Sequence, residues 1–170
     1  MRKFSFLCVF IIMSLVLSTS MNSLAIPAHA RSMESGNQKP PVKIYSSLEE
    51  IPGATTESVA LIFFSLVCHV CWEELFEMKE FVEKFSLPVL LVGVSADKPD
   101  ELKSFASRYS FDSPIIYDAN KLLFRRFKVK IEPYRVILVK NQTVYADDYS
   151  LDYLTRRDRA KQCLLQIASR

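Results

Sequence analysis

The chain has 170 residues, of which 49% are apolar and 24% are charged, and its formal net charge is +3 at pH 7. This length and composition are typical of one folded globular domain. The net charge is too small to indicate a nucleic-acid partner. Two of the basic residues, Arg2 and Lys3, lie in the first thirty residues, which contain no acidic residue, so the rest of the chain is close to neutral.

The first thirty residues have the pattern of an export signal. Arg2 and Lys3 are followed by an apolar run from Phe4 to Leu17, and the segment ends in Ala-His-Ala at residues 28–30. Small residues at this spacing are typical of a signal-peptidase site. The apolar run is shorter than the roughly 20 residues of a membrane span, although an uncleaved anchor stays open as the alternative.

Both alternatives keep the basic start inside the cell and export the rest of the chain. We therefore expect a signal peptide or anchor at residues 1–30 and a polar linker rich in Pro, Gly and Ser at 31–41. One domain is expected at 42–170. Its expected location is the periplasm or the outer face of the cytoplasmic membrane.

The domain is predicted to open with a short alternating strand at residues 42–45. The continuous apolar run at 58–66 is typical of a strand buried on both faces. An amphipathic helix then begins near His69 and ends before Pro88, and a second buried strand follows at 89–95.

Asp97 and Pro99 are helix-start signals for the next helix. A short extended segment is predicted at residues 114–117, and Asp118 is expected to cap a helix at 119–127. Strands at 134–139 and 143–147 flank the turn Lys-Asn-Gln and predict a hairpin. Ser150 is expected to cap a last helix that runs to about residue 168.

This order of elements predicts an α/β domain with three layers. Strand–helix–strand units imply parallel neighbours with right-handed crossovers. The closing antiparallel hairpin makes the predicted sheet mixed.

The sequence Cys-His-Val-Cys lies where the buried strand gives way to the helix. Cys68 would occupy the helix N-terminus, where unpaired N–H groups and the helix dipole favour a thiolate. Cys71 lies one turn further along, close enough to form a small disulfide ring and to resolve a mixed disulfide at Cys68. A protonated His69 would add positive charge beside this pair. Exported cysteines tend to form disulfides, which leaves Cys163 as an odd, small apolar helix residue.

Other chemistries of the cysteine pair are less well supported. A zinc site needs about four ligands, and no second Cys or His pair follows. Haem attachment needs His directly after the second cysteine, where Trp72 stands. Two thiolates suffice for Cu(I), so copper binding stays open. We expect no bound cofactor.

The strand, the Cys-x-x-Cys pair and the helix together resemble a thioredoxin fold. The segment Cys-His-Val-Cys-Trp-Glu-Glu is similar to the TlpA-type extracytoplasmic thiol–disulfide oxidoreductases, whose motif Cys-x-x-Cys-x-x-Glu places its glutamate at Glu74. Pro133 stands before the hairpin, where this family has a cis-proline. The resemblance implies a thioredoxin-like three-layer fold with helices on both faces of the mixed sheet.

The resemblance also implies roles for individual residues. Ile62 replaces the buried aspartate of thioredoxin, so Glu74 becomes the candidate proton relay to Cys71. Glu132 precedes Pro133 and is a carboxylate that would raise the pKa of the thiols, in opposition to His69. The balance of these two effects leaves the reductase and oxidase directions open.

The function implied by the resemblance is exchange of dithiol and disulfide with exported protein partners, more often as a reductase. Typical clients include apocytochrome c, and a membrane electron donor would recharge the pair. We expect a monomer. The basic residues near the predicted third helix, which are typical of a solvated helix face, are Lys121, Arg125, Arg126, Lys128 and Lys130.

Two alternative functions remain. One is a Cu(I) chaperone, a class that usually has three residues between its cysteines. The other is a peroxiredoxin-like peroxidase, for which Ser65 satisfies the hydroxyl position three residues before Cys68, while Leu61 stands where a proline is usual.

Overall fold

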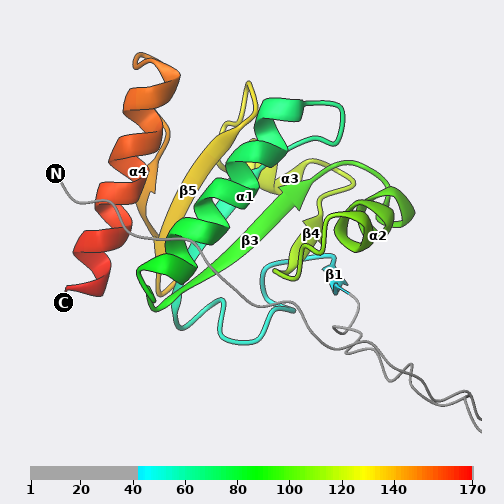
Figure 1. The fold of residues 1–170 in the computed structure, drawn as a ribbon, viewed down its shortest axis with the longest axis horizontal. Coiled ribbons are helices and arrows are strands. Elements are labelled where there is room, and N and C mark those ends of the chain that lie inside the picture. The colour runs from blue at the N-terminus through cyan, green and yellow to red at the C-terminus, as the bar shows by residue number, and fades with distance from the viewer. Residues whose placement is uncertain (1–41, 170) are drawn as a thin grey trace, which may run out of the picture. The chain divides into compact units, whose positions relative to one another are not determined.

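The computed structural model describes residues 42–169 of the chain. The predicted signal or anchor at 1–30 and the linker at 31–41 lie outside the described residues, as does Arg170. In the described part, no helix combines the length and apolar character needed to cross a membrane. Figure 1 shows the fold, whose elements are, in chain order, β1 Ile44–Tyr45, β2 Ser58–Phe63, α1 His69–Lys84, β3 Val89–Ser95, α2 Pro99–Arg108, β4 Ile115–Tyr117, α3 Leu122–Arg126, β5 Tyr134–Val139, β6 Gln142–Ala146 and α4 Tyr153–Ala168.

The strands form one mixed sheet in the order β1-β4-β3-β2-β5-β6. Strands β1, β4, β3 and β2 run parallel, while β5 is antiparallel to β2 and β6 is antiparallel to β5. The pairing of β5 with β6 contains a register shift between Ile137 and Leu138. The fold is thioredoxin-like, with the C-terminal antiparallel hairpin that the sequence predicted.

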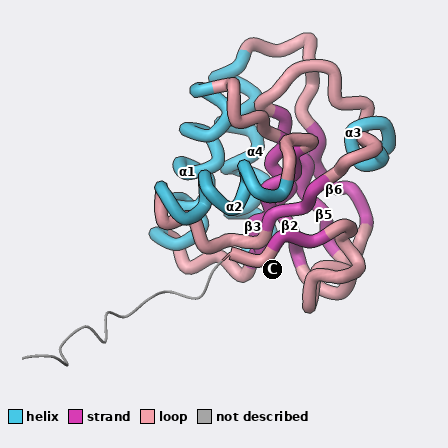
Figure 2. Tube along the Cα trace, turned by 90° about the vertical axis from the view of Figure 1, so that its right-hand side faces the viewer, coloured by secondary structure: helices cyan, strands magenta, loops and turns pink. Residues whose placement is uncertain are grey.

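The helices cover both faces of this sheet. Figure 2 shows α1, α2 and α4 on one side and α3 on the other. Alternate residues of β2 serve the two cores, because successive side chains of a strand point to opposite faces. Ala60 and Ile62 pack in the core under α1, whereas Leu61 and Phe63 pack in the core under α3.

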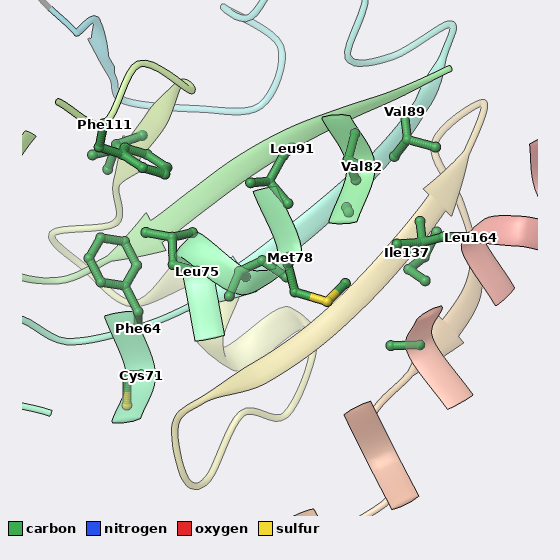
Figure 3. Packing of buried hydrophobic residues seen from close by; sticks show 14 of the residues in the cluster. Phe64, Cys71, Leu75, Met78, Val82, Val89, Leu91, Phe111, Ile137 and Leu164 are labelled. Atoms are coloured by element: carbon green, nitrogen blue, oxygen red, sulfur yellow. The ribbon is translucent and has the colours of Figure 1, made fainter. Parts of the chain in front are cut away.

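Helix α1 carries the cysteine pair at its N-terminal end and is anchored by its buried stripe. Leu75, Met78 and Val82 recur at helical spacing and are buried against the sheet, as Figure 3 shows. The helix ends where Ser86 adopts a left-handed backbone, with φ of 47° and with Pro88 beyond it. Its N-terminus is thereby fixed at one edge of a rigid core.

Several predicted boundaries were wrong by a few residues. Strand β2 ends at Phe63 rather than at residue 66, because the N–H of Leu66 donates to Asp97 instead of to a neighbouring strand. Strand β6 begins at Gln142, because the turn consists only of Lys140 and Asn141, both with positive φ.

Helix α4 starts later than predicted. The helix is capped by Asp152, whose side chain accepts a hydrogen bond from the N–H of Thr155. Ser150 was the predicted cap, but its own N–H donates to Asp148 two residues earlier. Ser150 is therefore part of a local turn, and the helix begins after this turn.

Helix α3 depends on the buried carboxylate of Asp118. This side chain accepts hydrogen bonds of 2.7, 2.8 and 3.0 Å from the N–H groups of Leu122, Leu123 and Phe124. The capping role predicted for Asp118 is confirmed, although the helix is shorter than the predicted range of 119–127. One carboxylate thus satisfies most of the unpaired donors of a short helix.

Replacing Asp118 by Ala should destabilise the protein by about 2–3 kcal/mol, because three N–H groups, one of them buried, lose a charged acceptor. Asp118→Asn should recover part of the loss. Urea unfolding checks both values. Asp152→Ala, which removes an exposed cap, is the control and should cost clearly less; equal losses would contradict the role of Asp118.

Candidate active site

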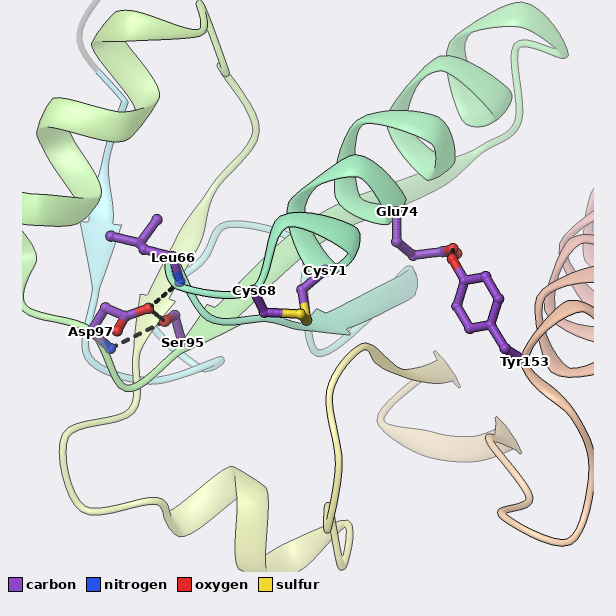
Figure 4. Close-up of a disulfide and its surroundings, with 7 residues drawn as sticks. All are labelled: Leu66, Cys68, Cys71, Glu74, Ser95, Asp97 and Tyr153. Carbon is purple, nitrogen blue, oxygen red and sulfur yellow. Dashed lines mark hydrogen bonds between the residues drawn. A yellow bond between two sulfur atoms is a disulfide. The ribbon is translucent and has the colours of Figure 1, made fainter.

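Cys68 and Cys71 form a disulfide at the N-terminus of α1, with a Cα–Cα distance of 5.3 Å (Figure 4). Cys68 is the N-cap residue and is half-buried, whereas Cys71 is fully buried. The N–H of Cys71 donates to the carbonyl oxygen of Cys68 at 3.0 Å. Of the two sulfur atoms, an incoming reactant reaches that of Cys68 more readily.

The loop before Cys68 is fixed by Asp97. Its carboxylate accepts hydrogen bonds from the N–H of Leu66 at 2.7 Å and from the hydroxyl of Ser95 at 2.9 Å (Figure 4). The sequence pattern indicated Asp97 and Pro99 as helix-start signals, and α2 does begin at Pro99. Asp97 has a further role, because it connects the end of β3 to the loop that carries the reactive cysteine.

The surface around Cys68 is apolar and aromatic. Val67 is 92% exposed and Val70 is half exposed. The ring of Trp72 lies 4.4 Å from that of His69 and 5.0 Å from that of Tyr109, measured between centroids.

Trp72 also lines a groove of about 410 Å³ with Leu66, Phe105 and Tyr109, and Asp100 and Glu101 lie at its rim. His69, the predicted electrostatic tuner, is exposed, and its Nδ1 lies 3.1 Å from Oε1 of Glu73. The nearest opposite charge to His69 therefore comes from its own helix.

Glu74, the predicted proton relay, is buried and points away from the disulfide (Figure 4). Its Oε1 accepts a hydrogen bond from Nε of Arg135 at 2.6 Å. Its Oε2 accepts a hydrogen bond from the hydroxyl of Tyr153. Both carboxylate oxygens are thus engaged by β5 and α4.

Arg135 joins Glu74 to a second buried carboxylate, that of Asp147. Nη1 of Arg135 lies 2.7 Å from Oδ2 of Asp147, and all three charged side chains are fully buried. Asp147 also accepts a hydrogen bond of 2.8 Å from the hydroxyl of Tyr145. We call Glu74, Arg135, Asp147 and Tyr153 the buried charge cluster.

This cluster was not predicted from the sequence. The signal was an arginine inside the apolar strand Tyr-Arg-Val-Ile-Leu-Val, since a fully buried Arg needs a charged partner. Nothing local indicated the partners, because Glu74 lies 61 residues from Arg135.

Burial and pairing both act on the pKa values of the cluster. Burial alone would lower the pKa of Arg135, but the hydrogen bond and charge of Glu74, followed by the charge of Asp147, raise it above its ordinary value. Burial raises the pKa of Asp147, although the charge of Arg135 opposes this effect. Burial and the hydrogen bond to Glu74 raise the pKa of Tyr153 to about 12, so its hydroxyl stays a donor at neutral pH.

The segment before β5 brings Glu132 and Pro133 toward the Asp97 loop. The Glu132–Pro133 peptide bond is cis, and Pro133 is buried. Burial raises the pKa of the half-buried Glu132; the charge of Lys121 opposes this effect, and the charge of Asp97 adds to it. Glu132 is therefore electrostatically coupled to the residue that fixes the Cys68 loop.

Cys163 lies apart from this site. It is half-buried in α4 and lines a groove between α4 and β6. Within residues 42–169, no three His, Cys, Asp or Glu side chains gather as a metal-binding group.

Comparison with known proteins gives one family and a set of similar folds. Residues 43–147 match the model of the AhpC/TSA family. No curated protein sequence matches the chain significantly.

Among solved structures, peroxiredoxin Q from Xanthomonas campestris has a TM-score of 0.58 at 21% identity, covering 68% of this chain and 82% of that one. A thioredoxin-like protein from Porphyromonas gingivalis has a TM-score of 0.53 at 16% identity, covering 66% and 76%. The thioredoxin domain of a thiol–disulfide oxidoreductase from Bacteroides vulgatus has a TM-score of 0.50 at 16% identity, covering 65% and 81%. At these identities the structures show a shared fold.

Replacing Arg135 by Met should destabilise the protein by about 3–5 kcal/mol, because Glu74 would stay buried without a counter-charge and Asp147 would keep only its 3.4 Å contact with Arg156. The triple variant Glu74→Gln, Arg135→Met, Asp147→Asn should recover more than half of this loss. Urea unfolding measures both. Arg159→Met, at an exposed position of α4, is the control. If Arg135→Met lowers the free energy of unfolding as little as this control does, the buried charge cluster does not stabilise the fold as argued.

Proposed function

The chain belongs to the AhpC/TSA family, and from this premise we propose that it exchanges dithiol and disulfide with exported protein partners through Cys68 and Cys71. The observation that carries the proposal is the disulfide at the start of α1, with Cys68 partly accessible and Cys71 buried behind it. The proposed protein is a TlpA-type reductase in the periplasm or on the outer face of the cytoplasmic membrane. A membrane electron donor would return the disulfide to the dithiol.

In the reducing direction, the thiolate of Cys68 attacks one sulfur of the client disulfide. The client S–S bond breaks, a mixed disulfide forms, and the second client sulfur leaves as a thiolate and takes up a proton. Cys71 then loses its proton and attacks the sulfur of Cys68, which releases the client and forms the Cys68–Cys71 bond. Two electrons pass from the dithiol to the client in this sequence.

The position of Cys68 supports its role as the nucleophile. The N-terminus of a helix favours negative charge and lowers the pKa of a thiol there. The first turn of α1 contains no acidic residue that would oppose this effect. The buried Cys71 suits the second step, which is intramolecular and needs no access for a client.

Glu74 remains our candidate proton acceptor for Cys71. It lies one turn further along the same buried face of α1. Arg135 and Tyr153 engage both oxygens of its carboxylate, which points away from the disulfide. In this proposal Glu74 must give up its hydrogen bond with Tyr153 and turn toward Cys71 before it accepts the proton.

A second candidate function is peroxide reduction, which membership of the AhpC/TSA family and the tight turn at Ser65 favour. The N–H of Cys68 donates to the carbonyl oxygen of Ser65 at 3.1 Å, so this residue lies beside the cysteine. Here the Cys68 thiolate would attack a peroxide oxygen, giving a sulfenic acid and, after protonation, an alcohol or water. Condensation with the Cys71 thiol would release water and form the same disulfide.

The protein should accelerate the reduction of insulin by dithiothreitol, and Cys68→Ser should abolish the acceleration. Cys71→Ser should accumulate a mixed disulfide with the client, because the resolving thiol is gone. Turbidity follows the reaction, and non-reducing electrophoresis detects the trapped complex. Cys163→Ser is the control and should retain activity within about twofold, since surface changes away from a site have small effects.

Different outcomes would support the other functions. Peroxide consumption that survives Cys71→Ser, with no insulin reduction, would replace the exchange proposal by the peroxidase. Stoichiometric binding of Cu(I) to the reduced pair without exchange would favour a copper chaperone. A glutathione redox titration then separates a reductase from an oxidase.

Glu132→Gln should lower the pKa of the Cys68 thiol, because it removes a negative charge that disfavours the thiolate. The variant and the wild type should react alike at a pH below the pKa of Glu132, where this carboxyl is neutral in both. As the pH rises, alkylation of the reduced variant by iodoacetamide should become faster than that of the wild type. Glu80→Gln, an exposed change on α1, should leave the pH profile of alkylation unchanged. Equal pH profiles for all three proteins would show that Glu132 does not affect the Cys68 thiol.

A further inference from the structure

A basic groove lies between α3 and the segment that leads to Pro133. Its volume is about 550 Å³, and Phe124 contributes an apolar wall. Four cations and one carboxylate line it: Lys121, Arg125, Lys128, Lys130 and Glu132. The sequence pattern indicated a solvated face for these basic residues, and all four are exposed; in addition, they border a concave surface.

The cations of this basic groove are only partly neutralised by the fold. Within residues 42–169, none of the four forms an ion pair with a carboxylate, although the charge of Lys121 acts on Glu132 in the same groove. Basic residues of α4, in contrast, do form ion pairs: Arg157 and Lys161 both pair with Glu77, at 3.0 and 2.5 Å. The groove thus keeps a positive field that an anionic ligand can use.

The backbone around the groove is fixed in advance. The carboxylate of Asp118 binds the start of α3 through three N–H groups. The hydroxyl of Tyr149 accepts hydrogen bonds of 2.7 and 3.2 Å from the N–H groups of Lys130 and Ile131. Both walls are therefore held by hydrogen bonds to side chains of neighbouring segments, so a ligand would not have to order them.

The basic groove begins close to the redox disulfide. Glu132 lies in the groove and immediately precedes Pro133, and its carboxyl is within electrostatic range of Asp97. Asp97 in turn accepts the hydrogen bond from Leu66, two residues before Cys68. The groove that Trp72 lines is charged differently, since its charged lining residues are Asp100, Glu101 and Arg108. The basic groove, with four cations and one carboxylate, is the more positive of the two.

We propose that the basic groove binds an acidic stretch of the client polypeptide, close to the client cysteine that forms the mixed disulfide with Cys68. This inference rests on the exchange function proposed above and names its substrate class. The clients would be exported proteins with Asp or Glu residues flanking a disulfide. Opposite charges across an interface mainly raise the association rate and select among partners.

Two synthetic peptides test the proposal. Both contain the same intramolecular disulfide, flanked by Asp and Glu residues in one and by Ser and Asn in the other. The reduced full-length protein should reduce the acidic peptide about tenfold faster at low ionic strength, and the difference should largely vanish at about 0.5 M salt. Rapid acid quenching and chromatography of the peptides give the rates.

A charge-reversed pair of variants identifies the groove as the cause. Arg125→Glu with Lys128→Glu should remove the preference for the acidic peptide and leave the rate with the neutral peptide unchanged. Lys43→Glu with Arg159→Glu changes the net charge of the protein equally at exposed positions outside the groove and should keep the preference. Equal rates for the two peptides with the wild type, both lost in Cys68→Ser, would overturn the groove proposal and leave the exchange function standing.

If neither peptide is reduced, a binding measurement with a peptide that cannot react tests the groove proposal separately from the exchange function. The acidic peptide with both cysteines replaced by Ser should still bind the wild type in a calorimetric titration and should not bind the Arg125→Glu, Lys128→Glu variant. Absence of binding to the wild type would overturn the groove proposal independently of activity. Loss of binding to vesicles with anionic lipid in this variant, with peptide rates unchanged, would assign the groove to a membrane surface and also overturn it.

Discussion

The position of the redox helix depends on one fully buried arginine. Arg135 in β5 pairs with Glu74 of α1 on one side and with Asp147 after β6 on the other. Three buried charges are stable only when they are closely paired. These ion pairs therefore fix the position of α1 relative to the hairpin of β5 and β6. Tyr153 extends the same constraint to α4 through its hydrogen bond to Glu74.

The two cysteines differ because this placement fixes where α1 begins. Asp97 holds the preceding loop through Leu66, so the first cysteine lies at the helix start and at the surface. Cys71, one turn later, falls on the buried face that also carries Leu75. The asymmetry between an accessible and a buried sulfur therefore follows from ordinary helix packing against the sheet.

Much of the fold could be predicted because its signals are local. The apolar run of β2, the buried stripe of α1 and the capping carboxylate of Asp118 each specify an element within a few residues. The buried charge cluster could not be predicted in this way, since Arg135 meets partners that lie 61 and 12 residues away. The hydrogen bond of Asp97 to the cysteine loop could not be predicted for a related reason, because its partner Leu66 lies 31 residues earlier.

The two outer strands of the sheet differ in how they limit unwanted pairing. Strand β1 has only two residues, which offers a short template to another chain. Strand β6 is longer and mostly exposed, but its pairing with β5 is interrupted by the register shift at Ile137 and Leu138. An added strand would have to follow that irregularity, which makes edge-to-edge aggregation unfavourable. The sheet of this protein is thereby less prone to pair with strands of other chains.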